Sequence, residues 1–183
     1  MNWMPPKFRL DRTVQATAYF LNLAGGVWDK FRLMKFSYML DRESLRQRGY
    51  AVTYDNYFSM ANGPILSNTL DLINGKKRER EWDSYFVTHG YGVSLSGELP
   101  YFGRLSRSDR EIMDGLYGGF GSWSFQKLKD HTHEFPEYTE VKKGRVPINL
   151  RDILKAVDYC PEDIEIILED IRCTGYRERL LGL

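Results

Sequence analysis

Two histidines, His131 and His133, are the residues in the sequence that come nearest to a metal-binding pair. At alternate positions of a strand both rings would face the same side, and imidazole nitrogens are good zinc ligands. A site needs at least one more ligand, which could come only from a carboxylate, His89, Cys160 or Cys173. No C-x-x-C, H-E-x-x-H or calcium-loop pattern accompanies the pair. The alternative is one ring bonded near a helix end and the other exposed. We expect no metal and no cofactor.

A glycine-rich segment, residues 118–122, precedes a predicted helix, so its backbone amides could hold an anion. Its spacing to Lys127 fits no phosphate-binding loop, and we interpret it as a connection between two helices. The sequence contains no G-x-S-x-G elbow, Walker loop or G-x-G-x-x-G motif. We therefore expect that the protein is not an enzyme. The enzymatic alternative is a site in which His133 works with a charged residue, namely Lys35, Glu134 or Asp130.

The length of 183 residues suffices for one well-buried core and is marginal for two domains. Lysine and arginine number 26 against 25 acidic residues, a balance that argues against a dedicated nucleic-acid-binding protein. No apolar run could cross a bilayer, and the first ten residues lack the pattern of a signal peptide. We expect a cytoplasmic protein with no membrane partner, in which Cys160 and Cys173 are reduced. A disulfide is the weaker alternative, because a helix predicted between them would hold them apart.

A helix over residues 27–48 is predicted to be the central element. One face carries Trp28, Phe31, Met34, Tyr38 and Leu45, and a second carries Leu33, Phe36 and Leu40. A helix that is apolar on two faces packs into the middle of a domain. Gly25-Gly26 and Gly49 are expected to mark its two ends. The polar residues are expected in the gaps between the faces: Lys30, Arg32, Lys35, Asp41 and Arg42.

Six further helices are expected from caps and periodicity. The first runs from Asp11 or Thr13 to Leu23, and the next begins at Pro64, in the first helical position, and ends at Ile73. The remaining four are expected after a capping box at residues 108–111, over residues 124–129 before a loop at 131–143, after Asn149, and from Pro161, with a tail from Tyr176.

Strands are favoured in two regions. Residues 50–61 are expected to form one or two short strands, and residues 85–87 and 91–95 the arms of a hairpin around His89-Gly90. The fold class is accordingly mainly α (α+β): a single helical domain over residues 1–183, built around a central buried helix with a small β-hairpin. The C-terminal helices, residues 149–175, are expected to pack on it.

A run of charged residues, KKRERE at 76–81, contains no apolar side chain. It could contact a phosphate or an acidic partner. We favour a solvated loop, because such runs are usually exposed.

Three segments, in this order, resemble the Panacea domain, the SocA-like antitoxin domain family of bacteria and phages. In FRLMKFSYMLDRESLRQRG, Lys35 and Tyr38 match the family pattern. In YDNYFSMANGPILSNTLDLINGK the matches are Tyr57, Met60, Gly63, Pro64, Ser67 and Leu72. In LKDHTHEFPEY they are Leu128, Thr132, His133 and Pro136. Tyr138 stands where many members have tryptophan, so no role for an indole donor carries over. The resemblance covers roughly residues 13–140.

The resemblance implies a mainly helical domain with a small β element and no known catalytic activity. It also implies the antitoxin of a type II-like toxin–antitoxin module, which neutralises a protein toxin, encoded by a neighbouring gene, by binding it. The motif residues would serve either the fold or the partner: Lys35, Tyr38, Tyr57, Gly63, Pro64, Thr132, His133 and Tyr138.

Lys35 lies on a largely apolar helix, and a buried lysine needs a carboxylate or carbonyl partner. We expect Thr132 and His133 on the other side of that polar cluster, and we favour a structural role for it. The toxin would then bind elsewhere: on the charged run, on the last helix, which is acidic outside, or on the hairpin, where three aromatics could anchor an interface, Tyr85, Phe86 and Tyr91.

Two other binding functions remain open. The apolar tail ERLLGL would suit an adaptor that passes a bound client to a host protease. A phage counter-defence protein is a variant of the binding function that the genome context would distinguish.

Overall fold

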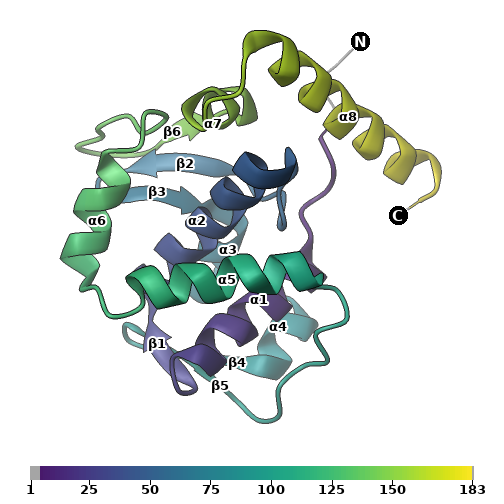
Figure 1. Ribbon diagram of the computed structural model, residues 1–183. Helices are drawn as coiled ribbons and strands as arrows, with labels where there is room; N and C mark the ends of the chain where they lie inside the picture. The colour runs from purple at the N-terminus through teal and green to yellow at the C-terminus, as the bar shows by residue number, and fades with distance from the viewer. Residues whose placement is uncertain (1–4, 183) are drawn as a thin grey trace.

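The computed structural model describes residues 5–182. In that part of the chain eight helices and six short strands follow one another (Figure 1). The helices are α1 (Leu10–Leu23), α2 (Lys30–Arg48), α3 (Ser67–Ile73), α4 (Arg80–Tyr85), α5 (Arg107–Phe120), α6 (Phe125–His133), α7 (Leu150–Ala156) and α8 (Pro161–Leu180). The strands are β1 (Val27–Asp29), β2 (Tyr57–Met60), β3 (Gly63–Leu66), β4 (Phe86–His89), β5 (Gly92–Leu95) and β6 (Val146–Ile148). The predicted class, mainly helical with a small β part, is confirmed.

Helix α2 passes through the middle of the molecule and contacts α1, α5, α6, α7 and β3 (Figure 1). It begins at Lys30, because the side chain of Asp29 caps it by accepting hydrogen bonds from the N–H groups of Phe31 and Arg32. Gly49, in the left-handed region at φ 71°, ends it as expected.

The predicted start of the central helix was wrong. Residues 27–29 form β1, since a capping residue needs an extended backbone before the first helical turn. The sequence left the burial of Lys35 open, and the structure buries both Lys35 and Asp41, at 2% and 0% exposure. Apolar periodicity does not separate a solvated polar residue from one that is bonded inside the core.

The strands form two antiparallel sheets, β1-β5-β4 and β3-β2-β6 (Figure 1). The predicted hairpin is β4–β5, with Phe86 opposite Leu95 and His89 opposite Gly92. Of its aromatics, Tyr91 is 67% exposed, but Phe86 is buried against Trp82, so the expectation of an exposed Phe86 was wrong.

The region after the tyrosine-rich segment also differs from the prediction. The helix predicted from Pro64 begins at Ser67, and residues 63–66 form β3 instead. β3 pairs with β2 in a tight hairpin in which Met60 lies opposite Gly63. Proline is tolerated there because β3 is at the edge of its sheet, where no ladder hydrogen bond is lost on the outer side.

Several predicted helix ends were displaced by tertiary packing. The capping box is formed by Ser106 and Asp109 rather than by residues 108–111. α5 continues through Gly118-Gly119 to Phe120, because it packs along α2, which outweighs the roughly 1 kcal/mol cost of each glycine. α6 extends to His133 and α8 to Leu180, into segments predicted as loop and tail. The expected starts after Asn149 and at Pro161 are confirmed.

Helices α7 and α8 lie at the top of Figure 1, with α8 running along the outside. Ile164 and Leu168 of α8 belong to the same hydrophobic cluster as α1 and α2. Near its C-terminal end the buried carboxylate of Glu178 accepts hydrogen bonds from the backbone N–H of Lys7 and the guanidinium of Arg9. No helix within residues 5–182 is both long and apolar enough to cross a membrane.

Candidate functional site

The site begins with three side chains of α2 that point into the core, Lys35, Tyr38 and Asp41. They are three residues apart, so they follow one face of the helix. All three are at most 2% exposed. Each polar group therefore needs an internal partner, and each finds one on a different segment.

Lys35 bonds to the hairpin β2–β3. Its ammonium donates to the carbonyl oxygen of Pro64 at 3.0 Å. Burial, with a smaller contribution from the charge of Lys129, lowers the pKa of Lys35 to about 7. Within residues 5–182 no carboxylate lies within ion-pair distance of it. The lysine is thus held by a carbonyl and lacks a counter-charge.

Gly63 is required at its position for two reasons. Its φ of 95° is strained for residues with a side chain. A Cβ atom built there would lie 2.5 Å from the Lys35 Nζ and 2.9 Å from the Thr132 Oγ1. The turn therefore approaches α2 and α6 as closely as a backbone can.

Thr132, His133 and Tyr138 close the cluster from α6 and the loop after it. The Thr132 hydroxyl donates to the carbonyl of Lys129, and the Tyr138 hydroxyl donates to the carbonyl of Met60 at 3.1 Å. The His133 and Tyr138 rings stack with centroids 4.3 Å apart. Burial, together with the nearby lysine charges, lowers the pKa of His133, and its buried Nε2 has no hydrogen-bond partner within residues 5–182.

Tyr38 takes part in a second set of contacts with the segment after α6. Its hydroxyl donates to the Glu137 Oε1 at 3.0 Å, and the Nε of Arg42 donates to the same oxygen at 2.7 Å. The guanidinium of Arg42 also lies over the ring of Phe135. Burial, with Glu137 beside it, raises the pKa of Tyr38.

Tyr57 belongs to a third set around Asp41. The Asp41 carboxylate accepts hydrogen bonds from the backbone N–H groups of Val52 and Thr53, from the Thr53 hydroxyl, and from the Tyr57 hydroxyl at 2.8 Å. Burial raises the pKa of Asp41 to about 6, against the opposite effect of these hydrogen bonds. Asp41 ties the loop after α2 back onto the helix.

The structure therefore brings six of the eight motif residues into one group, the Lys35 cluster: Lys35, Gly63, Pro64, Thr132, His133 and Tyr138. Tyr38 and Tyr57 bond elsewhere, although their rings meet edge to face at 6.0 Å. Sequence reasoning missed Asp41, Arg42 and Glu137. A carboxylate on the apolar face of a helix is the one signal that could have identified Asp41.

The histidine pair does not form a metal site. His131 stacks on Phe120, whereas His133 stacks on Tyr138, so the rings, both on helix α6 and not on a strand, serve different contacts. Residues 5–182 contain no group of three or more His, Cys, Asp or Glu that could hold a metal ion. Cys160 and Cys173 are free, so no disulfide joins them.

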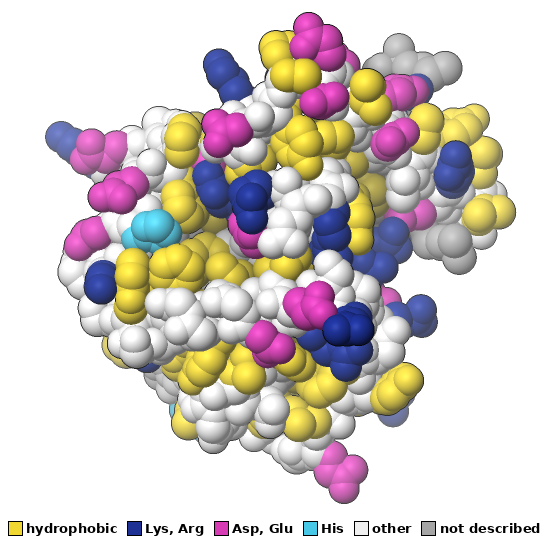
Figure 2. Space-filling model, viewed as in Figure 1, with side chains coloured by type: hydrophobic (Ala, Val, Ile, Leu, Met, Phe, Trp, Pro, Cys, Tyr) yellow, Lys and Arg dark blue, Asp and Glu magenta, His cyan; other side chains and the backbone are white. Residues whose placement is uncertain are grey.

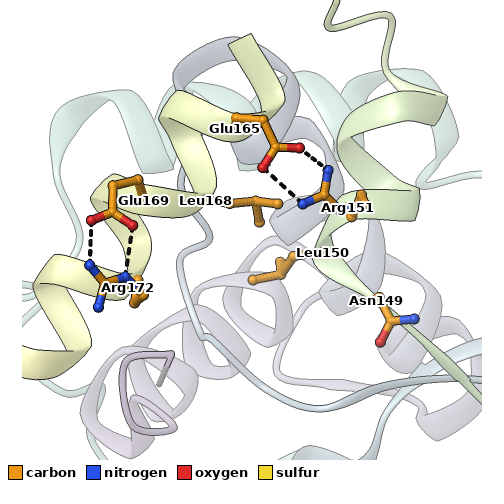
Figure 3. A pocket seen from close by; sticks show the side chains of 7 residues that line it. All are labelled: Asn149, Leu150, Arg151, Glu165, Leu168, Glu169 and Arg172. Carbon is orange, nitrogen blue, oxygen red and sulfur yellow. Dashed lines mark hydrogen bonds and ion pairs between the residues drawn. The ribbon is translucent and has the colours of Figure 1, made fainter. Parts of the chain in front are cut away.

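Two pockets lie along α8, away from the Lys35 cluster. One, of about 360 Å³, lies between α7 and α8, where Leu150 and Leu168 face each other and two ion pairs flank them, Arg151–Glu165 and Arg172–Glu169 (Figure 3). The other, of about 410 Å³, lies in the hollow between α8 and the body, where basic side chains gather (Figure 2). Of these, Arg9 is paired with Glu178 and Arg48 with Asp109. These four ion pairs account for most of the charged side chains in the two pockets.

A family model described as antitoxin SocA-like, Panacea domain, matches residues 33–139, more than half of the chain. The chain belongs to this family. No curated protein and no solved structure matches it. The Panacea domain thus extends from α2 to the loop after α6 and contains all eight motif residues. The helices α1, α7 and α8 lie outside the matched range.

Proposed function

We propose that this Panacea-domain protein is the antitoxin of a two-gene toxin–antitoxin module, and that it neutralises a protein toxin by binding it directly in the cytoplasm without catalysing a reaction. The observation that carries the proposal is the family match over residues 33–139. The geometry is consistent with it, because most polar motif side chains make internal hydrogen bonds and His133 stacks on Tyr138. The side chains that make these bonds are Lys35, Thr132, Tyr38, Tyr57 and Tyr138. On this proposal the motif residues shape the domain, and the toxin contacts other parts of its surface.

Co-expression with the product of the adjacent gene tests this function. The toxin alone should stop growth, and the antitoxin should restore growth while the two proteins co-purify in a fixed ratio. Because neutralisation by binding uses up one antitoxin for each toxin, rescue of growth should require at least as much antitoxin as toxin. Rescue by a small fraction of that amount, with no complex, would contradict direct neutralisation.

A proteolytic adaptor is the second candidate. It is favoured by Leu180 and Leu181 at the end of α8, which are 69% and 71% exposed. Apolar side chains so exposed are suited to contact with another protein. An adaptor would shorten the half-life of the toxin in a pulse-chase experiment, and the double change Leu180→Ser and Leu181→Ser would restore it. An unchanged half-life would exclude the adaptor. A counter-defence role would leave the adjacent product without toxicity.

A further inference from the structure

The hairpin β4–β5 has an outer edge with no neighbouring strand. In the sheet β1-β5-β4, strand β4 pairs only with β5. The N–H of Ser96 bonds to the carbonyl of Tyr85, which sets the alternation along the hairpin. Val87 and His89 therefore turn their backbone groups toward β5, whereas Phe86 and Thr88 turn theirs outward. The Phe86 N–H already bonds to Trp82 at the end of α4, so the outward groups left open are those of Thr88 and the Phe86 carbonyl.

The other sheet edges are protected in ways that β4 is not. β3 carries Pro64 and is buried along its length, and β6 carries Pro147. β1 has three residues and passes directly into α2. Proline, burial and extreme shortness are the usual means of preventing an edge strand from pairing with another chain. β4, with the sequence FVTH, has four residues, no proline and no lysine, glutamate or aspartate. Its backbone is available to a partner.

A groove of about 470 Å³ lies beside this edge. Strand β4 and the helices α3 and α4 line it; Leu72, Trp82 and Phe86 form its buried floor, and Val87 is an exposed apolar side chain of its lining. Lys30 and Arg78 add positive charge. Arg78 is paired with Asp83. Lys30 donates to the side-chain oxygen of Asn74 at 3.2 Å and lies over the rings of Phe31 and Tyr91, but within residues 5–182 it has no carboxylate within 4 Å. The groove is therefore mixed in character, with one ion pair, Arg78–Asp83, and one lysine that has no carboxylate of the described chain beside it.

We propose that the toxin adds an extended segment to the outer edge of β4 as a fourth strand of the sheet β1-β5-β4. This inference rests on the proposed antitoxin function and adds to it the place and mode of binding. Main-chain hydrogen bonds to Thr88 align the segment, and its alternate side chains face the groove. Because Lys30 has no carboxylate of the described residues beside it, the segment that fits best carries an acidic side chain at the position facing Lys30.

Two variants at Thr88 separate backbone pairing from side-chain contact. Thr88→Pro removes the outward N–H without removing a hydrogen bond to β5, and Thr88→Ala changes the side chain but keeps the N–H. With the purified product of the adjacent gene as the probe, Thr88→Pro should weaken the complex about tenfold or more, because a buried acceptor of the toxin loses its donor. Thr88→Ala should bind within about threefold of the unchanged protein.

Amide hydrogen exchange on the unchanged protein supplies a second measurement, in case Thr88→Pro does not fold. In the free chain the Thr88 amide should exchange faster than those of Val87 and His89, and in the complex it should become protected. A complex that leaves the Thr88 amide unprotected overturns the edge-strand mode but not the antitoxin function. The absence of any complex overturns both. A free chain that is a dimer with Thr88 already protected assigns the edge to a second copy and overturns the proposal.

Discussion

Within residues 5–182 Lys35 is buried without a counter-charge, so removing its charged form from water costs the fold free energy. Its amino group is held in the core by one carbonyl, and no carboxylate of the described chain compensates its charged form. The sequence predicted that a lysine on this helix needs a carboxylate or carbonyl partner, and the structure supplies the carbonyl of Pro64. The identity of that partner could not be predicted, because Pro64 was placed in a helix. Asp41 was missed for the same physical reason: its partners come from a loop, and periodicity along one helix says nothing about them.

The low pKa of Lys35 predicts that stability depends on pH. Unfolding raises this pKa from about 7 toward the ordinary value of 10.5. Between these values the unfolded chain binds more protons than the folded one, so the free energy of unfolding rises with pH. Lys35→Met should abolish this contribution. The difference in stability between the unchanged protein and Lys35→Met should move in favour of the unchanged protein by about 1 kcal/mol per pH unit between pH 7.5 and 9.

Urea unfolding at four pH values measures this difference. The same substitution at Lys142, an exposed lysine in the loop before β6, is the matched control. A constant difference between the unchanged protein and Lys35→Met across the range would mean that Lys35 keeps its proton in the core.

At the scale of elements, the sequence predicted a helix or strand correctly wherever caps and turns within that segment determine where it begins or ends. The end of α2 at Gly49, the hairpin β4–β5, and the starts of α7 and α8 followed from caps and turns. The predictions for β3, α5 and α6 were wrong where contacts with α2 determine the type of element or the residue at which it ends. Pro64 suits a helix start and an edge strand equally, and only pairing with β2 selects between them. The Lys35 cluster likewise depends on α6 meeting a turn that lies far from it in sequence.

The loop after α2 provides a prediction at this scale, because Asp41 accepts three hydrogen bonds from it and a fourth from Tyr57 of β2. Asp41→Ala leaves the buried amides of Val52 and Thr53 without an acceptor, and it should lower the free energy of unfolding by roughly 3–5 kcal/mol. Tyr57→Phe removes a single bond and should cost about 1 kcal/mol. In the double variant the two costs should not add, because both changes remove the same hydrogen bond.

Urea unfolding of the three variants checks this prediction. Asp114→Ala, which removes one exposed hydrogen bond from Tyr19, is the control and should change stability by less than about 1 kcal/mol. A loss of similar size for Asp41→Ala and Asp114→Ala would show that the loop is held by other contacts.

For the whole molecule, the family range and the fold do not coincide. The Panacea match ends at residue 139, but the hydrophobic cluster continues into α7 and α8. At its far end α8 is tied to the chain before α1 through Glu178, which joins the first and last parts of the described molecule. The amphipathic pattern of α8 predicted that it packs, whereas the ion pair with Arg9 joins residues at opposite ends of the sequence and has no local signature.

Glu178→Ala tests the attachment of α8. Loss of the acceptor for Arg9 and for the Lys7 amide should lower stability by about 1 kcal/mol, a modest value because the Arg9 side chain is 32% exposed. Amide exchange should rise in the last two turns of α8 and stay unchanged in α2. Glu169→Ala, which removes an exposed pair within α8, should change stability by less than about 0.5 kcal/mol. Equal effects of the two variants would argue that Glu178 does not fasten the helix.

Two segments that are far apart in the sequence enclose the amino group of Lys35, and this affects how α6 can detach locally from the domain. The turn at Gly63 and the end of α6 both lie against its amine. Detaching α6 alone would return the amine to water, where it binds a proton at neutral pH. Opening of α6 is therefore coupled to proton uptake, and acidification lowers its free energy while leaving the packing of α5 on α2 untouched. The effect falls between the two pKa values of Lys35: as the pH falls from about 9 toward 7, the amides of α6 should exchange progressively faster, whereas those of α5 should not.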